Sequence, residues 1–366
     1  MAIFLLGLFL LISLINILYF IGYFSFASAK ESKSTYTPPI SVIICAKNEA
    51  ENLKKFIPAI LDQNYPDFEI ILVNDASTDE TFEVMEGFQA LDSRIKLVNV
   101  ENNEAFWGKK KYALTLGIKK ASNTHLLFTD ADCEPETNLW ISEMASNFEH
   151  DKSIVLGYGG YHKKKGSFIN KAIRYETFLT AIQYFSYAKW GSPYMGVGRN
   201  LAYTSQEFYS QNGYATHLHI RSGDDDLFVN QAATPENTAI TFNRSGITRS
   251  IPKENFNKWM LQKRRHVSTA KYYKKKHKLL LASFYISQIS FWILLVALLI
   301  LKIYWPVVLA VLLIRLIIQF AVFYKSAKKL DEMDLLWLYP FLEVFLIFTQ
   351  LGIFSMNIFS KPASWK

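Results

Sequence analysis

The chain has 366 residues, of which 50% are hydrophobic and 15% aromatic, with 28 Phe and 20 Tyr. This composition is rich in apolar side chains for a soluble enzyme, and the length allows one large domain or two ordinary ones. The formal net charge of +8 needs no nucleic acid to explain it, because much of the excess lies in a lysine-rich run over residues 271–278. That run suits an anionic cytoplasmic leaflet, and it serves equally well as a topology signal.

The apolar residues are concentrated at the two ends of the chain. Residues 3–26 form an uncharged apolar run, which is long enough to span a bilayer as a helix. The run is longer than the apolar part of a usual signal peptide, and no basic residue precedes it. A retained membrane anchor is therefore favoured over a cleaved signal peptide.

The region from about residue 38 to residue 278 alternates short β-branched runs with helical stretches. The expected strands cover residues 40–45, 68–73, 95–99 and 126–129, and the expected helices cover residues 49–61, 78–91 and 110–120. Such alternation predicts an α/β domain with a mostly parallel sheet flanked by helices. Ligands of such a sheet gather at the carboxyl ends of its strands.

Acidic residues follow the expected strands at the ends where ligands bind. Asp75 follows one strand, residues 130–132 (Asp-Ala-Asp) follow another, and three aspartates stand at residues 224–226. Carboxylates at the ends of buried strands are costly to bury unless a cation or a ligand meets them. Together with the basic run at residues 262–266, they predict a site for a divalent metal, a phosphate and a catalytic base, as needed to move a sugar from a nucleotide.

These motifs resemble the signature of family 2 glycosyltransferases with the GT-A fold. The resemblance rests on residues 41–49 (SVIICAKNE), 73–79 (VNDASTD), 129–132 (TDAD), 223–226 (GDDD) and the Gln-x-x-Arg pattern that begins at Gln262. It covers about residues 38–270, and the apolar segments on both sides match the membrane-bound branch of the family. The resemblance implies an inverting, metal-dependent transfer of a sugar from a nucleotide diphosphate sugar.

The resemblance implies nucleotide contacts near the first two strands. Glu49 and Asp75 would accept hydrogen bonds from the ribose and the base of a uridine-like nucleotide, with help from the backbone around Ala46. Capping of the following helix is the alternative role for Asp75. Lys110 matches the family pattern Gly-Lys-x-x-Ala-Leu, but Lys109 replaces the expected glycine, so both lysines are candidates and a solvated helix start is the alternative.

The Asp-Ala-Asp motif is the expected metal site. Mg²⁺ and Mn²⁺ prefer hard oxygen ligands and keep positions open for substrate phosphates. Asp132 would hold the metal directly, and Asp130 would contact the ribose or a metal-bound water. A loop-capping role is the alternative for such a motif.

The three aspartates at residues 224–226 would supply the catalytic base. An inverting transferase needs one carboxylate that takes the proton of the acceptor hydroxyl, and adjacent carboxylates can raise the pKa of one of them. Alignment of Gly223 and Asn230 with the family motif places the base at Asp225, with Asp224 as second choice. A calcium loop is the rival reading, but the run lacks the alternating ligands of an EF-hand.

The Gln-x-x-Arg motif would contact the diphosphate and the acceptor. Arg265 offers a fork of donors that suits phosphate, and Gln262 would support the acceptor side. His266 stands where the family usually has the tryptophan of the acceptor platform, which weakens a claim of long-polymer synthesis. Asn200, in a flexible glycine-containing loop, is a further acceptor candidate. A purely membrane-surface role is the alternative for the basic helix expected over residues 254–278.

Three more apolar segments follow the polar region, at residues 279–301, 304–323 and 335–359. The second contains Arg315 and the third contains Glu343. Charges inside a membrane span are expensive and normally face protein or a polar cavity. The two residues are therefore expected either to pair or snorkel near a helix end, or to line a groove for an amphiphilic acceptor.

The basic residues beside the apolar segments predict the topology. The lysines of residues 271–278 and 325–329 place the polar region and the loop after the third segment in the cytoplasm, while the loop after the second segment holds only Lys302. The N-terminus is then expected outside. Lys361 and Lys366 argue weakly against an outside C-terminus, so a re-entrant last segment stays open.

The expected organisation has three parts. Residues 1–29 form a membrane anchor, residues 30–278 form a cytoplasmic GT-A catalytic domain with amphipathic helices near the bilayer, and residues 279–366 form a membrane region with about three helices. The two cysteines, Cys45 and Cys133, show no metal-binding or redox spacing and are expected as buried free thiols.

The function expected from the sequence is transfer of a hexose or N-acetylhexosamine from a UDP-sugar, with GDP less favoured. The acceptor would be a lipid, a lipid-linked sugar or a glycan at the cytoplasmic face of the cell membrane. A processive polysaccharide synthase is the alternative enzyme, and a catalytically inactive GT-A membrane scaffold is the alternative of another class. The sequence does not define the sugar, the acceptor, the choice between Mg²⁺ and Mn²⁺, or the oligomeric state.

Overall fold

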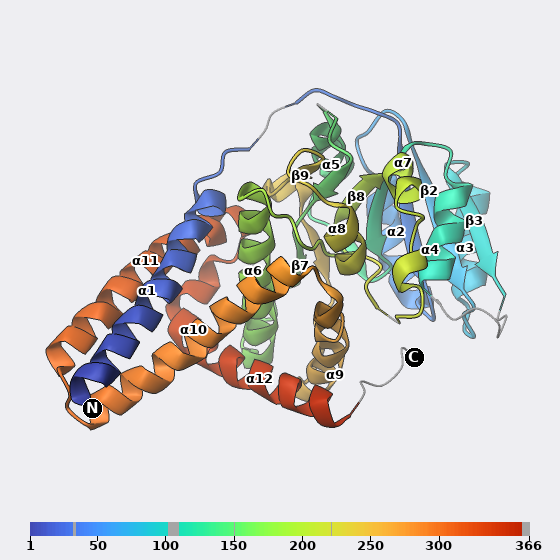
Figure 1. The fold of residues 1–366 in the computed structure, drawn as a ribbon. Helices are drawn as coiled ribbons and strands as arrows, with labels where there is room; N and C mark the ends of the chain where they lie inside the picture. Colours follow the sequence, from blue (N-terminus) through green and yellow to red (C-terminus); the bar gives the residue numbers. More distant parts are fainter. Residues whose placement is uncertain (32–33, 102–109, 150, 221, 361–366) are drawn as a thin grey trace.

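The computed structural model describes residues 1–31, 34–101, 110–149, 151–220 and 222–360. Figure 1 shows an α/β domain with a group of long helices packed against one side of it. The α/β class and the mostly parallel sheet expected from the alternating pattern are confirmed.

The main sheet has seven strands in the order β3-β2-β1-β4-β8-β6-β9. The strands are β1 (Ile40–Ala46), β2 (Phe68–Asp75), β3 (Ile95–Val100), β4 (His125–Asp130), β6 (Ile154–Leu156), β8 (Leu201–Thr204) and β9 (Thr238–Ile240). The strands β1 to β4 pair in parallel, whereas β8 is antiparallel to both β4 and β6. The predicted parallel strands thus form one half of a mixed sheet.

A second sheet of three strands stands beside the first, in the order β5-β10-β7. Its strands are β5 (Cys133–Pro135), β7 (Gly159–Tyr161) and β10 (Thr248–Ser250). Because β5 follows Asp132 directly, this small sheet fixes the chain on one side of the Asp-Ala-Asp motif. The alternation of long strands and helices gave no sign of these three-residue strands.

The helices of the α/β domain are α2 (Ala50–Leu61), α3 (Thr81–Leu91), α4 (Lys110–Lys120), α5 (Trp140–Ala145), α6 (Phe168–Lys189), α7 (Ser205–Ser210), α8 (Asp226–Ala232) and α9 (Phe256–Val267). α3 begins at Thr81 rather than at residue 78, because Asp79 accepts hydrogen bonds from the backbone N–H and hydroxyl of Thr81 and holds the preceding residues in a turn. α4 packs closely on the sheet at Gly117. A side chain there would clash, because its Cβ would lie only 2.8 Å from Cγ2 of Val73 in β2.

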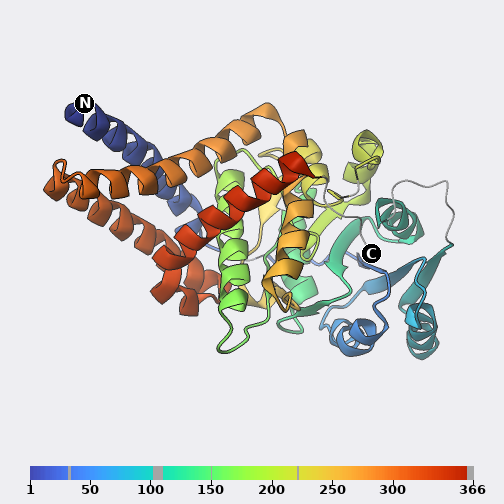
Figure 2. The same ribbon diagram turned by 90° about the horizontal axis from the view of Figure 1, so that it is seen from below.

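Within the described residues, four helices are long and apolar enough to cross a membrane, which supports membrane association of the chain. They are α1 (Ala2–Ala27), α10 (Lys275–Ile300), α11 (Trp305–Leu330) and α12 (Tyr339–Phe359), the last preceded by the 3-10 helix η5 (Met333–Leu338). Figures 1 and 2 show that α1, α10 and α11 form a bundle, whereas α12 crosses this bundle and runs beneath α6 and α9.

Arg315 and Glu343 form an ion pair in the interior of these helices, and both side chains are fully buried. The pairing alternative expected from the sequence is therefore the one observed. The boundaries expected for the three parts of the chain stay predictions.

Candidate active site

The acidic motifs meet at the carboxyl ends of the parallel strands. A small cavity at this edge is lined by residues from β1, β4, α4 and the loop before α8, including Cys45, Lys110, Thr129, Asp130, Asp224 and Asp225. The parallel pairing of β1 with β4 brings Cys45 opposite Asp130. Side chains far apart in the sequence therefore face one space.

Lys110 joins the two acidic motifs. Its Nζ lies 2.8 Å from Oδ1 of Asp130 and 3.1 Å from Oδ2 of Asp224. Burial alone would lower the pKa of the Lys110 ammonium, but the two carboxylates raise this pKa well above its ordinary value. Lys110 therefore stays charged and partly neutralises both motifs. The competing candidate, Lys109, lies outside the described residues.

Asp225 has the surroundings of a base. Its Oδ2 accepts a hydrogen bond from the Gly198 N–H at 2.8 Å, and its Oδ1 accepts one from the Asp226 N–H at 2.7 Å. Burial and the negative charges of Asp224 and Asp226 raise the pKa of Asp225 to about 7. Burial would also raise the pKa of Asp224, but the Lys110 ammonium outweighs it and holds that pKa below its ordinary value. Environments that push two carboxyl pKa values apart favour separate roles for them.

Asp226 is occupied by structural contacts. Its Oδ2 accepts hydrogen bonds from the hydroxyls of Thr269 at 2.5 Å and Tyr273 at 2.6 Å. These two residues flank the 3-10 helix η4 (Ala270–Tyr272), which connects α9 to α10. Asp226 therefore fastens the three-aspartate motif to the start of the long apolar helix α10.

Asp130 and Asp132 are placed to hold a cation. Ligand atoms of Asp130, Asp132 and Cys133 lie within 4.8 Å of one another. Burial and the neighbouring charge of Asp130 raise the pKa of Asp132, so a cation between the two carboxylates would relieve their repulsion. Burial raises the pKa of the Cys133 thiol well above its ordinary value, which keeps the thiol protonated. The two carboxylates therefore fit Mg²⁺ or Mn²⁺, and the thiol does not.

Ala46, Glu49 and Asp75 lie together where β1 and β2 end. The chain turns sharply after β1 because Asn48 has a φ of 57°. Asp75 is buried and Glu49 is half-buried, and burial raises the pKa of Glu49. The capping alternative for Asp75 is not observed, because Glu80 is the residue that precedes α3.

Arg265 of α9 lies near the acidic motifs, and Gln262 precedes it by one turn of the same helix. The charges of Asp224, Asp130 and Asp225 act on Arg265, which is half-buried, and burial lowers its pKa. The Oε1 atom of Gln262 is buried without a hydrogen-bond partner among the described residues, as expected for an atom that meets a ligand.

Two other basic residues of α9, Lys263 and Arg264, make contacts with neighbouring helices. Lys263 forms an ion pair with Glu176 of α6, and Arg264 donates a hydrogen bond to Asn357 of α12. The basic face of α9 is thus used for packing against neighbouring helices, while His266 is exposed. These contacts leave less of the helix available for the purely membrane-surface alternative.

Asn200 is placed differently from the expectation. It is fully buried, its Oδ1 accepts a hydrogen bond from the Trp140 indole at 3.0 Å, and its Nδ2 donates to the backbone carbonyls of Tyr158 and Gly246. An amide with all of its polar atoms engaged gives an acceptor no contact. We therefore correct the assignment: Asn200 supports the loop that carries the Gly198 N–H. Of the two cysteines, Cys133 is buried as expected and Cys45 only partly.

The sequence gave no signal for three residues that shape the site. Lys111 is buried, and its Nζ donates to three backbone carbonyls between residues 217 and 222, which holds the loop that leads to Gly223. Ser250 of β10 hydrogen bonds to Asp132, and the charge of Arg199 acts on the same carboxylate. These residues belong to no recognisable motif, because only the folded chain brings them to the site.

Comparisons with known proteins agree with this geometry. Residues 41–211 match the profile of glycosyl transferase family 2. This region is therefore similar to the catalytic domains of that family. The chain is 29% identical over 156 residues to an uncharacterized glycosyltransferase of Haemophilus influenzae, covering 43% of this chain and 44% of that protein. It is 31% identical over 130 residues to glycosyltransferase GlyG of Streptococcus pneumoniae, covering 35% of this chain and 42% of that protein.

The chain thus spans less than half the length of these curated relatives. Among solved structures, the mannosyltransferase PcManGT from Pyrobaculum calidifontis, in complex with GDP-Man and Mn²⁺, superposes with a TM-score of 0.59 at 18% identity. The match covers 94% of this chain and 97% of that one. Its low identity limits the comparison to the fold, and it confirms the GT-A architecture.

Proposed function

We propose that this chain is an inverting, metal-dependent glycosyltransferase. It would move a hexose or N-acetylhexosamine from a nucleotide diphosphate sugar, with UDP the favoured nucleotide, to a lipid, lipid-linked or glycan acceptor. The observation that carries this proposal is the meeting of two separate acidic motifs at Lys110, next to Asp225 with its raised pKa. One motif suits a cation and diphosphate, and the other suits proton removal.

Asp225 would act on the acceptor. Its carboxylate would take the proton of the acceptor hydroxyl while the oxygen attacks the anomeric carbon from the face opposite the diphosphate. The two backbone N–H groups that donate to Asp225 fix its direction. A pKa of about 7 keeps it basic enough to accept a proton and largely ionised above neutral pH.

The leaving diphosphate would be held by Asp130, Asp132, Lys110 and Arg265. Asp130 and Asp132 would bind Mg²⁺ or Mn²⁺, which supplies charge neutralisation for the leaving group when bound. Lys110 would exchange part of its contact with the carboxylates for a phosphate oxygen. The fork of Arg265 donors would contact the phosphates from α9.

The nucleotide would lie over the ends of β1 and β2, against Ala46, Glu49 and Asp75. The fold neighbour from Pyrobaculum calidifontis was solved with GDP-Man and Mn²⁺, which supports a nucleotide diphosphate sugar and a divalent metal for this chain as well. Gln262 would face the acceptor, since its buried Oε1 lacks a partner among the described residues. His266, exposed on the same helix, would stand at the acceptor entrance.

The test is nucleotide release from a panel of UDP- and GDP-sugars by the purified chain in lipid, with and without Mn²⁺. Release from one donor that requires the metal, and is lost in Asp132→Asn and in Asp225→Asn, is expected. Glu254→Gln, at an exposed position just before α9, is the matched control and should keep full activity. Absence of turnover and of donor binding by folded protein would overturn the transferase proposal in favour of a scaffold.

Product length separates this proposal from processive synthesis. One curated relative, a poly-β-1,6-N-acetyl-D-glucosamine synthase of Staphylococcus epidermidis, is 36% identical over 93 residues, which is 25% of this chain. The exposed His266 in place of a tryptophan favours one or few additions. A long ladder of products on a defined acceptor would establish the processive alternative.

A further inference from the structure

Three of the apolar helices have one end at the α/β domain and the other end far from it. The last turns of α1 meet α6, where the Trp190 indole donates to the Gly22 carbonyl at 3.0 Å. α10 begins just after Tyr273, whose hydroxyl donates to Asp226. The opposite ends pack against one another in a separate apolar cluster: Phe9, Phe291, Leu295, Leu298 and Val308. This arrangement is that of three membrane-spanning helices.

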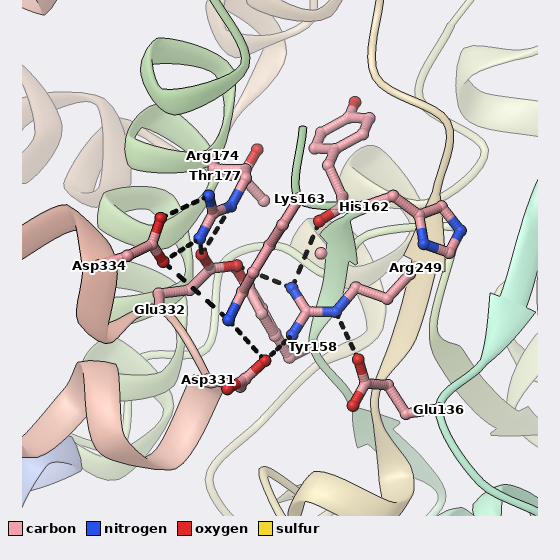
Figure 3. Close-up of polar contacts among 12 residues, drawn as sticks. Glu136, Tyr158, His162, Lys163, Arg174, Thr177, Arg249, Asp331, Glu332 and Asp334 are labelled. Carbon is pink, nitrogen blue, oxygen red and sulfur yellow. Dashed lines mark hydrogen bonds and ion pairs between the residues drawn. The ribbon is translucent and has the colours of Figure 1, made fainter. Parts of the chain in front are cut away.

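The connector at residues 331–334, which leads through η5 into α12, is fastened to the α/β domain. In the first turns of α12 itself, Phe341 and Phe345 pack on Phe168 of α6. Arg249 of β10 holds three carboxylates at once: its Nε lies 2.9 Å from Glu136, its Nη1 2.8 Å from Glu332 and its Nη2 3.1 Å from Asp331. Figure 3 shows these carboxylates around the Arg249 guanidinium. One side chain thus joins the segment after the Asp-Ala-Asp motif to the end of α11.

A second arginine completes this attachment. Arg174 of α6 is fully enclosed, and it forms ion pairs with Glu332 and Asp334. Glu332 has no exposed surface and also accepts a hydrogen bond from the Tyr158 hydroxyl at 3.1 Å. Buried ion pairs of this kind need a fixed geometry, so the connector lies on the domain side of the membrane.

The other end of α12 is fastened to the same domain. The Arg264 Nε donates to Oδ1 of Asn357 at 3.0 Å, and its Nη2 donates to the Ser360 carbonyl at 2.9 Å. Asn357 returns a hydrogen bond from its Nδ2 to the Arg264 carbonyl at 3.1 Å. A guanidinium at the carboxyl end of a helix satisfies the last carbonyls and the helix dipole. Arg264 directly precedes Arg265 in α9, so this end of α12 lies close to the candidate site.

The two faces of α12 differ. One face is buried against the protein and includes Leu342, Glu343, Leu346, Ile347 and Ile353. The other face exposes a stripe of large apolar side chains: Phe341, Phe348, Leu351, Phe354 and Ile358. A helix with one packed face and one apolar exposed face needs an apolar partner along its whole length.

From these contacts we propose that α12 lies in the plane of the membrane, on the leaflet that faces the α/β domain, and that the chain crosses the bilayer three times. A folded polar domain occupies one side of a bilayer, so a helix whose two ends both bind that domain does not cross. Figures 1 and 2 agree, since α12 runs across the direction of the other three helices.

The occupant of the exposed stripe is the acyl region of that leaflet. The stripe continues the lipid-facing surface of the bundle, because α12 contacts α10 through the Tyr285 hydroxyl and the Ile347 carbonyl and contacts α11 through Arg315. A helix lying in the interface buries its apolar face about 5–10 Å into the headgroup and acyl boundary. α12 would thereby hold α9 and its Arg265 at the membrane surface.

Cysteine labelling in sealed membranes tests the number of crossings. The variants are Lys302→Cys in the loop between α10 and α11, Lys54→Cys on exposed α2 and Lys366→Cys at the C-terminus, each treated with a membrane-impermeant maleimide before and after permeabilisation. The unsubstituted chain reports background from Cys45 and Cys133. Lys366→Cys is expected to react from the same face as Lys54→Cys and opposite to Lys302→Cys. Reaction of Lys366→Cys together with Lys302→Cys would overturn the proposal.

The depth of spin labels in the bilayer tests the orientation of α12 without a label at the C-terminus. Spin labels at Phe341→Cys, Phe348→Cys and Ser355→Cys should report one shallow depth, while Leu309→Cys and Phe320→Cys on α11 should report different depths. A depth gradient along α12 that matches the gradient along α11 would also overturn the proposal. Both experiments need only folded protein in a membrane, so their outcome is independent of the proposed transferase activity.

Discussion

The chain has two networks built around buried arginine and glutamate, one among its apolar helices and one where the connector meets the α/β domain. Both charged side chains of the first are buried, whereas Lys163 and Asp334 lie at the exposed edge of the second. In the first, the Arg315 guanidinium pairs with Glu343 and donates to Oδ1 of Asn16 and Oε1 of Gln319 at 2.7 and 2.9 Å. Gln319 also donates to Glu343 at 2.7 Å. Gln288 and Trp292 of α10 donate to Glu343 as well, so this network of one cation, one anion and neutral donors joins α1, α10, α11 and α12.

The second network contains more charge. Its anions outnumber its cations, with four carboxylates (Glu136, Asp331, Glu332 and Asp334) around Lys163, Arg174 and Arg249. It joins a connector to two elements of the α/β domain, α6 and β10, rather than one apolar helix to another (Figure 3).

The comparison teaches that buried charge does two different things in this protein. A single balanced pair can in principle be replaced by apolar side chains, because no charge is left behind. The connector network cannot be removed one pair at a time, since each arginine serves several carboxylates. The first network therefore fixes helix association, and the second fixes where the membrane helices sit on the α/β domain.

The largest expected effect comes from breaking the connector network. Glu332→Gln leaves Arg174 and Arg249 without their shared anion, and removal of one partner of a buried pair costs about 3–5 kcal/mol. We expect a loss of unfolding free energy toward the upper end of that range, measured by denaturant unfolding in nanodiscs. Glu254→Gln is the control, because the Glu254–Lys258 pair is exposed. A loss as small as that of the control would contradict a clamping role for Glu332.

Replacement of the Arg315–Glu343 pair should lower the free energy of unfolding by less. Glu343→Leu alone leaves the Arg315 charge buried with only amide partners and should cost about 3 kcal/mol. Arg315→Met combined with Glu343→Leu should recover most of this loss, because both charges are gone. The same unfolding measurement checks both variants. If the double variant is no more stable than Glu343→Leu alone, apolar side chains cannot replace the pair, and the expectation is contradicted.

A third pair of variants tests whether the connector network or the bundle network influences metal binding by Asp130 and Asp132. β10 pairs with β5, which directly follows Asp132, and Ser250 hydrogen bonds to that carboxylate. Arg249→Lys keeps the charge but loses the fork of donors, so the Mn²⁺ concentration for half-maximal activity should rise about 10–100-fold, as for other supporting contacts of metal ligands. Arg315→Lys should leave that concentration unchanged. If the required Mn²⁺ concentration rises in both variants, or in neither, the two networks do not differ in their influence on metal binding.

The smallest effect concerns the pH dependence, which neither network should alter. The proposed base, Asp225, has a pKa raised to about 7. It would accept a proton only when ionised, so activity should be lost as the pH falls through 7. The rate should rise about 10-fold from pH 6 to pH 8. Asp226→Asn removes a neighbouring negative charge and should move this rise to lower pH. Rate profiles of Arg249→Lys and Arg315→Lys that coincide with the parent profile complete the comparison.

Much of the fold follows from local patterns. The β-branched runs before Ala46, Asp75 and Asp130 become parallel strands because strands buried on both faces need continuous apolar residues. α4 ends where the sequence predicts, at Lys120. The short strands β5, β7 and β10 could not be predicted, since three residues carry no periodicity and are held by pairing with distant segments.

The candidate site divides in the same way. Asp130, Asp132, Asp224, Asp225 and Arg265 were found from motif spacing and the resemblance, and the structure brings them to one edge of the sheet. Asn200 was misassigned because its loop position suggested a ligand contact, whereas its burial and hydrogen bonds show a supporting role. Lys111 and Ser250 were missed because their contacts depend on chain segments far away in the sequence.

The sequence by itself determined which segments are apolar and which strands end in carboxylates, because each of these is a local property of composition. The tertiary structure alone decided that Lys110 joins two acidic motifs, that Arg249 joins β10 to the connector and that both ends of α12 bind the α/β domain. Hydropathy cannot separate a helix that crosses a membrane from one that lies in it. That difference depends on what the two ends of the helix contact.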